Sequence, residues 1–271
     1  MLSVTTDYAT DRGCPEPYLR RIADHGFSHV HWCHQWNTDF LYSEPEIAQI
    51  ERWMRETGLG LTDLHASEGV EKRWTSAREY ERQAGVELVR NRVEMTARLG
   101  GDVAIMHIGS VPEGPDAAAR FWDQLWRSLD ELTPVLRTTG VRIAIENGVF
   151  AHIRRVFERY GPDVVGLCYD CGHGNMSGDG LDETEALSDR LISLHLHDND
   201  GTRDLHMPLF TGTVDWPRLA RIIARAPYSK WVSMETTMGR SGIADEDAFL
   251  RTVYDTGMRF TAMIEEARGA A

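Results

Sequence analysis

Short apolar runs alternate with longer amphipathic stretches along almost the whole chain. The apolar runs are rich in Val, Ile and Leu, and some, such as VAIMHI and VRIAIE, have no polar interruption before their last residues. Such runs are typical of parallel strands that are covered on both faces. They predict eight strands, at 2–6, 28–33, 59–66, 102–108, 141–146, 164–170, 191–197 and 231–235.

The stretches between the runs predict helices, because their apolar positions recur at helical spacing. Pro217, which follows Asp215 and Trp216, indicates a helix start, since proline is tolerated in the first turn. Strands and helices in strict alternation predict an α/β fold, a single (β/α)8 TIM barrel with an eight-stranded parallel sheet, with residues 1–271 forming one domain. The predicted helices are 15–25, 44–57, 76–99, 115–139, 151–160, 183–190, 215–225 and 245–267.

Composition and charge narrow the class of protein. The formal net charge of −13 argues against non-specific binding to nucleic acid or to an anionic membrane, because both are bound through Lys and Arg surfaces. No run approaches the ~20 apolar residues of a membrane span. The opening residues, MLSVTTDYATDRG, lack the basic and apolar regions of a secretory signal. Together these features predict a cytoplasmic enzyme.

A metal-type ligand closes each of the last four predicted strands. These ligands are Glu146 in IAIEN, Asp170 in VGLCYDCGH, His197 in ISLHLHD and Glu235 in WVSMET. A parallel barrel gathers the carboxyl ends of its strands around one mouth, so we expect the four side chains to converge. Three carboxylates and one imidazole suit Mn²⁺, Mg²⁺, Co²⁺ or Zn²⁺. The sequence therefore predicts a metal-dependent barrel enzyme.

Other polar residues near these strand ends leave alternatives open. Cys168 and Cys171 form a CxxC around Asp170, and we interpret them as small packing residues rather than as a redox or zinc motif. Asp170 and His173 form D-x-x-H, whose alternative is a hydrogen-bonded pair without metal. We expect Gly172 and Gly174 to bend the backbone there. His195 lies two residues before His197 and is either a second ligand or a hydrogen-bonded core residue.

Histidines and tryptophans also end or follow the earlier strands. His65 and His107 end predicted strands, and His34 lies just past another, which favours a polar site at the mouth. Aromatic side chains there can form an apolar pocket wall against sugar C–H groups, with plain core packing as the alternative for each of them. The candidates are Trp32, Trp36 and Trp74.

Taken together, these motifs resemble a known superfamily over nearly the whole chain. The segments IEN, D-x-x-H, HLHDNDG, D-x-H, GTVDW and the final ET are similar to those of the xylose-isomerase-like TIM barrels, in particular the sugar phosphate isomerase/epimerase group. The resemblance to ketose 3-epimerases implies one divalent metal ion, with Mn²⁺ favoured. It assigns the ligands to Glu146, Asp170, His197 and Glu235. It implies substrate contacts for His173 and for Arg203, six residues after His197.

The same segments are also similar to endonuclease IV, which nicks abasic DNA with three metal ions. That resemblance implies additional ligands, namely His65, His107, His173, Asp204 and His206. The negative charge favours the sugar enzyme, as does the lack of a basic or intercalating loop in the sequence. The chain departs from the sugar group at Leu209 and Phe210, where that group is usually rich in glycine.

The resulting expectation is a metal-dependent isomerase or epimerase that moves a proton through an enediolate. Glu146 and Glu235 are the expected acid–base pair, and His65, His107 and Trp32 join His173 and Arg203 as substrate-binding residues. The expected partner is a small sugar, and binding to nucleic acid or to a membrane is not expected. Because barrels of this group often associate, the resemblance also implies a homo-oligomer. The remaining alternatives are a lyase or dehydratase acting on keto-sugars or inososes and a partner-dependent subunit.

Overall fold

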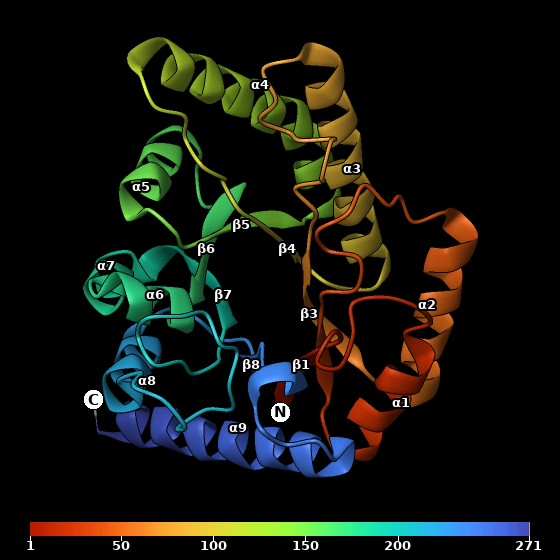
Figure 1. Ribbon diagram of the computed structural model, residues 1–271, viewed down its shortest axis with the longest axis vertical. Coiled ribbons are helices and arrows are strands. Elements are labelled where there is room, and N and C mark those ends of the chain that lie inside the picture. The colour runs from red at the N-terminus through yellow and green to blue at the C-terminus, as the bar shows by residue number, and fades with distance from the viewer. Residues whose placement is uncertain (271) are drawn as a thin grey trace.

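Eight parallel strands form the ring at the centre of the molecule (Figure 1). In the computed structural model, which describes residues 1–270, neighbouring strands pair in the order β7-β6-β5-β4-β3-β2-β1-β8. An isolated bridge between Leu196 and Met234 joins the two ends, so the predicted (β/α)8 barrel is confirmed. The strands are β1 Leu2–Thr5, β2 His29–Trp32, β3 Gly60–His65, β4 Val103–Met106, β5 Arg142–Glu146, β6 Val165–Asp170, β7 Leu191–His195 and β8 Val232–Met234.

Helices surround this ring, with α9 along one side and α3 and α4 on the opposite side (Figure 1). The longer helices are amphipathic and pack their apolar faces against the strands. The α-helices are α1 Glu16–Asp24, α2 Glu44–Thr57, α3 Glu79–Arg98, α4 Pro115–Thr139, α5 Phe150–Arg159, α6 Cys171–Ser177, α7 Gly180–Ala186, α8 Trp216–Arg225 and α9 Glu246–Gly269. Short 3₁₀ turns lie at Ser188–Arg190 and Met238–Arg240.

Local sequence signals explain where several helices begin and end. Ser43 and Glu46 form a capping box at the start of α2, and Gly58 ends it in the left-handed conformation with φ of 72°. Asp215 accepts a hydrogen bond from the amide of Arg218 at 2.9 Å, which caps α8. The helix start predicted around Pro217 is therefore confirmed.

The segment between β6 and β7 differs from its prediction. The sequence predicts one helix at 183–190, but the structure has two, α6 and α7, followed by a 3₁₀ turn. Helix α6 escapes prediction because CGHGNMS carries two glycines, which ordinarily disfavour a helix. Gly172 and Gly174 were expected to let the backbone bend and turn His173 toward the mouth; His173 does lie there, but both glycines are helical. They are required for close packing instead: a Cβ at Gly174 would lie 2.4 Å from the hydroxyl of Tyr169.

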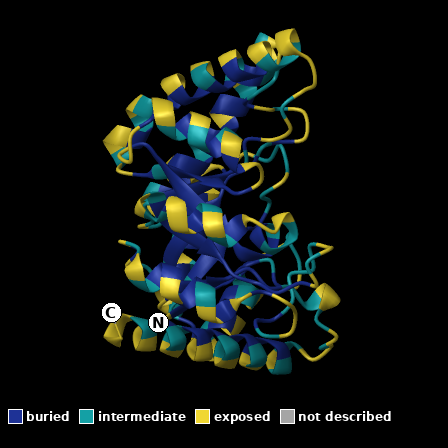
Figure 2. Cartoon of the chain, turned by 90° about the vertical axis from the view of Figure 1, so that its left-hand side faces the viewer, coloured by how far each residue is buried: buried dark blue, intermediate teal, exposed yellow. Residues whose placement is uncertain are grey.

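Burial is concentrated in the strands and in the inner faces of the helices (Figure 2). The strands are buried on both faces, which accounts for their continuous apolar runs. Polar side chains also point into the barrel, and His31, Asp63 and Ser193 are among those that are fully buried. None of the helices within residues 1–270 is both long and apolar enough to cross a membrane.

Candidate metal centre

The carboxyl ends of β5 to β8 bring buried acids and imidazoles together, as the strand-end rule predicts. Glu146 ends β5, Asp170 ends β6 and His195 ends β7, while Glu235 follows β8 directly. All four are buried. The site is therefore built on strand ends rather than on loops, which makes its geometry rigid.

His195 lies at the centre of the site. Its Nδ1 atom is 3.2 Å from Oε2 of Glu146 and 3.1 Å from Oε2 of Glu235. Both glutamates therefore approach one nitrogen from strands that are three apart in the ring. Of the two roles left open for His195, the structure favours that of a ligand beside the glutamates.

His197 lies in a neighbouring cluster with Asp170. Its Nε2 atom is 3.0 Å from Oδ2 of Asp170, and its ring stacks on His206 with centroids 4.0 Å apart. His206 in turn lies 3.1 Å from Asp204. The side chains of His197, His206 and Glu235 offer ligand atoms within 4.8 Å of one another. The four predicted ligands thus lie in one site, but Asp170 and His197 form a pair beside the Glu146–Glu235 pair.

A third group of imidazoles surrounds Glu146. Its Oε2 atom lies 3.3 Å from Nε2 of His65 and 3.5 Å from Nε2 of His107. Its Oε1 atom lies 3.1 Å from Nδ1 of His173, and the other nitrogen of that ring is 3.5 Å from Asp204. The structure therefore brings the predicted residues His65, His107 and His173 to the site.

Two further residues of the sequence motifs, Asn147 and Asp198, hold the strand ends in place through hydrogen bonds. The side-chain amide of Asn147 donates to the carbonyl of Asp170 at 2.9 Å, and its oxygen accepts from the Asp170 amide at 2.5 Å. The IEN segment therefore ties the end of β5 to the end of β6. Asp198 accepts from the indole of Trp216 at 2.9 Å and from the amide of Val214 at 3.2 Å. This links the HLHD and GTVDW segments.

Buried atoms without partners test whether the site suits a metal ion. Within residues 1–270, Oε2 of Glu146, Nδ1 of His195, Nδ1 of His197 and Oδ1 of Asp204 are buried and have no hydrogen-bond partner. Buried polar atoms are rarely left unpaired, because desolvation is costly. Carboxylate oxygens and imidazole nitrogens are donors for Mn²⁺-class ions, so the residues present fit a divalent cation.

The electrostatics of the site point the same way. Burial raises the pKa of Glu146, but the charges of His107 and His195 outweigh it and hold that pKa well below its usual value. The charge of Asp170 raises the pKa of His173 to about 12 despite burial. Carboxylates that stay ionised and imidazoles that retain protons indicate a strong demand for positive charge. A divalent cation would meet that demand and release those protons.

Two substrate-binding predictions do not match the placement of the side chains. Trp32 is packed in the core, 1% exposed, with its indole nitrogen donating to Tyr42 at 3.3 Å. The prediction of substrate contact by Trp32 is therefore wrong, because its side chain points away from the barrel interior. The guanidinium of Arg203 is exposed and pairs with Asp200 at 2.8 Å, so the structure does not bring it to the cluster.

Another tryptophan and another arginine, Trp36 and Arg240, lie at the mouth instead. Trp36 lies against His65 with ring centroids 4.6 Å apart and the ring planes tilted by 46°, and its side chain lines the cavities at the mouth. Arg240 lies beside the site, where its guanidinium donates to the carbonyl of Asp204. Sequence reasoning missed Arg240 because it follows β8 on a loop whose path has no local signal. It also missed Asp7, a carboxylate two residues after the end of β1 that lines one of the cavities.

Two cavities open above the cluster and share Trp36. One of about 550 Å³ is lined by Glu146 and His107, and one of about 450 Å³ is lined by Glu235 and His206. Arg240 is the only Lys or Arg among the described residues that line these two cavities. Each glutamate therefore faces its own cavity.

Comparisons with known proteins agree with this architecture. The family model for the xylose isomerase-like TIM barrel matches residues 19–259. The protein y4fM of Sinorhizobium fredii is 30% identical over 93% of this chain and 90% of its own. A probable endonuclease 4 of Mycobacterium leprae is 28% identical over 60% of this chain and 68% of its own. The structure of a D-tagatose 3-epimerase-like protein has a TM-score of 0.79 and 18% identity over 99% of this chain and 98% of its own.

Proposed function

Because the chain belongs to the xylose isomerase-like TIM barrel family, we propose that it is a divalent-metal-dependent isomerase or epimerase of a sugar or sugar-like ketone. The reaction is transfer of a proton at a carbon next to a carbonyl group. One observation carries the proposal: Glu146 and Glu235 are both buried and approach the same nitrogen of His195 from different sides of the mouth. Similarity to the D-tagatose 3-epimerase-like protein supports this choice of reaction class.

The residues have distinct roles in this reaction. A divalent ion, with Mn²⁺ favoured, held by Glu146, Glu235, Asp170 and a histidine, would supply a Lewis acid for the substrate oxygens. Glu235 removes the proton on one face of the substrate and Glu146 returns it on the other, which inverts the stereocentre. Transfer by one glutamate on a single face gives an aldose–ketose isomerisation instead. His173 orients the substrate through its contact with Glu146.

Both glutamates are prepared for this role by their surroundings. Burial raises the pKa of Glu235, but the charge of His195 and contacts with His195 and His31 lower it well below its usual value. An ionised carboxylate is the form that a general base requires. Glu146 is ionised for the same reason, so either glutamate can begin the reaction.

The cavities favour a neutral substrate of modest size. Trp36 offers an aromatic face to both of them, and such faces pack against the C–H surfaces of sugars. Glu68 lines the first cavity and Asp7 and Asp204 line the second, next to the two glutamates. Such an acidic mouth repels phosphate, which supports an unphosphorylated sugar.

An NMR screen in D₂O tests the proposed reaction. The purified protein with Mn²⁺ would be mixed with ketoses, aldoses, inosose-type ketones and the phosphates of each. We expect deuterium to enter an unphosphorylated compound at the carbon next to the carbonyl, because the proton exchanges with solvent on the glutamate. Exchange confined to the phosphates would contradict the substrate assignment. No exchange in any of these compounds would contradict the reaction.

A second function is favoured by a specific observation, namely the additional ligands around the central pair. His65 and His107 meet Glu146 on one side, and His173, Asp204 and His206 meet on the other. These are the additional ligands that the resemblance to endonuclease IV, a phosphodiesterase with three metal ions, implies. Similarity to the probable endonuclease 4 of Mycobacterium leprae also supports this alternative.

Metal content and DNA cleavage distinguish the two functions. We expect elemental analysis of the purified protein to give close to one Mn²⁺-class ion per chain, and duplex DNA with an abasic site to remain intact. The reason is the acidic mouth, which disfavours a DNA backbone. A content near three ions together with efficient nicking would favour the phosphodiesterase. An authentic endonuclease IV serves as the positive control for the DNA substrate.

A further inference from the structure

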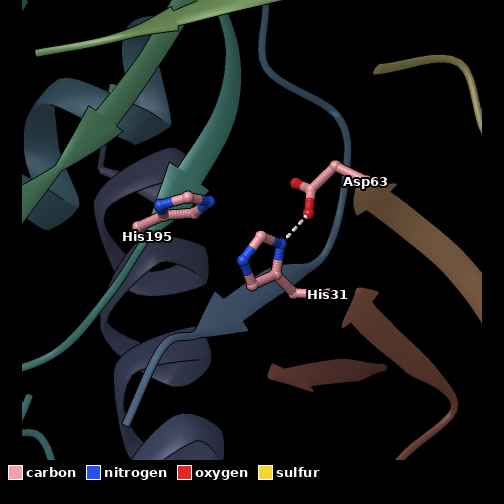
Figure 3. Close-up of side chains that lie close together, drawn as sticks. All are labelled: His31, Asp63 and His195. Atoms are coloured by element: carbon pink, nitrogen blue, oxygen red, sulfur yellow. Dashed lines mark hydrogen bonds and ion pairs between the residues drawn. The ribbon is translucent and has the colours of Figure 1, made fainter. Parts of the chain in front are cut away.

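A buried acid–imidazole pair lies inside the barrel, below the candidate metal centre (Figure 3). His31 on β2 faces Asp63 on β3, and its Nδ1 atom is 2.5 Å from Oδ1 of Asp63. The hydroxyl of Ser193 on β7 donates to the other oxygen of Asp63. All three side chains are fully buried. The proposed reaction gives none of them a role.

Both oxygens of Asp63 accept a hydrogen bond, whereas one ring nitrogen of His31 has no partner. One oxygen of Asp63 accepts from the ring of His31 and the other from Ser193, so the carboxylate fixes the ring plane. The Nε2 atom of His31 has no hydrogen-bond partner in the part of the chain that the structure describes. It lies 3.4 Å from Oε1 of Glu235, and the ring centroid is 4.3 Å from that of His195. The free end of the pair is therefore aimed at the metal centre.

Energetics make a purely structural role a poor explanation. A buried charged pair costs more to desolvate than an apolar pair of the same size, and apolar replacements are often neutral or stabilising. A barrel interior filled by branched apolar side chains is the ordinary solution. A chain that instead buries Asp63 and His31 under a glutamate gains something other than stability from them.

We infer that His31 is a positioning residue for Glu235, with Asp63 and Ser193 as its anchor. The ring donates from Nδ1 to Asp63 and from Nε2 to Oε1 of Glu235. Oε2 of Glu235, the oxygen beside His195, is thereby left for the metal ion and the substrate. This inference rests on the proposed role of Glu235 in the metal centre. It adds a second layer of residues that holds a ligand in its productive rotamer.

Three variants test the positioning role. The amide of His31→Asn reaches Asp63 but not Glu235, so we expect Mn²⁺ affinity to fall by about 10- to 100-fold. We expect kcat to fall with it and KM for the sugar to change less. The longer amide of His31→Gln reaches toward Glu235 and should recover part of the Mn²⁺ affinity. His29→Asn is the matched control on the same strand, because His29 contacts Ser28 and Trp231 rather than the metal centre.

The readouts separate this inference from the proposed function. Mn²⁺ affinity is measured by calorimetry and needs no substrate, so it reports on positioning even if the D₂O screen finds no reaction. A folded His31→Asn variant with unchanged Mn²⁺ affinity would overturn the inference while leaving the reaction intact. Should that variant not fold, Ser193→Ala decides, because it removes the hydroxyl that anchors Asp63. We expect its Mn²⁺ affinity to fall by about 10-fold, and a folded Ser193→Ala protein with unchanged affinity overturns the inference.

Discussion

Replacing Glu235 by glutamine is expected to lower the rate of deuterium incorporation into the product by at least about 100-fold, the usual contribution of a general base. Glutamine has the shape of glutamate but cannot accept the substrate proton. It also removes one negative charge from a site where Glu235 lies 3.1 Å from His195 and 3.4 Å from His31. The measurement is NMR in D₂O with the sugar identified in the substrate screen, together with elemental analysis of the bound metal.

The control for this variant is Glu266→Gln, which makes the same chemical change on the exposed face of α9. We expect it to keep the full rate. The thermal midpoint of Glu235→Gln should fall, because the substitution leaves the buried rings of His195 and His31 without their carboxylate partner, so circular dichroism is used to show that the variant is folded. Full turnover by a folded Glu235→Gln protein would remove Glu235 from the role of base.

The second large effect is expected from Gly172→Ala in α6. A Cβ at this position would lie 2.0 Å from Cε1 of His197 and 2.7 Å from each of its ring nitrogens. The ring is fully buried and has no free space to move into, so the added methyl group must displace His197 from Asp170. We expect a loss of stability of about 1–3 kcal/mol, as for other overpacked cores. Metal affinity should fall as well.

Helix propensity alone predicts the opposite result, since alanine is about 1 kcal/mol more favourable than glycine within a helix. Gly269→Ala is therefore the matched control: Gly269 is also helical, and no atom lies within 4 Å of its added Cβ. Denaturant unfolding of both variants measures the difference. If Gly172→Ala were as stable as the control and bound metal normally, the close packing of α6 on His197 would be refuted.

The strands were predictable because parallel barrels give them a strong signal. Runs such as IAIE are buried on both faces and end at the mouth, so apolar content located them and their last residues marked the site. Helix α6 was not predictable, since glycine signals flexibility in a sequence but close approach in the structure. Gly172 and Gly174 are present because His197 and Tyr169 pack closely against them, and those contacts exist only in the folded structure.

The site was predictable to the extent that its residues end strands. Strand alternation also held information that was not used, because neighbours on a strand point to opposite faces. If His31 points into the barrel, Trp32 must point outward, which excludes it from the substrate pocket. The same rule puts Asp63 on the inner face with His65. Arg203 and Arg240 lie on loops, where neither periodicity nor strand order determines the direction of a side chain.

The seam between β7 and β8 connects the chemistry of the site to the mechanics of the barrel. It is closed by the Leu196–Met234 bridge, in which the amide of Glu235 donates to the carbonyl of Leu196 at 3.0 Å and the amide of Leu196 to the carbonyl of Ser233 at 3.0 Å. His195 lies on one side of this seam and Glu235 on the other. A divalent cation held by both of these side chains would therefore link the two strands that close the ring. Metal binding would then stabilise the closure of the barrel as well as the site itself, and metal removal would weaken the seam next to Glu235.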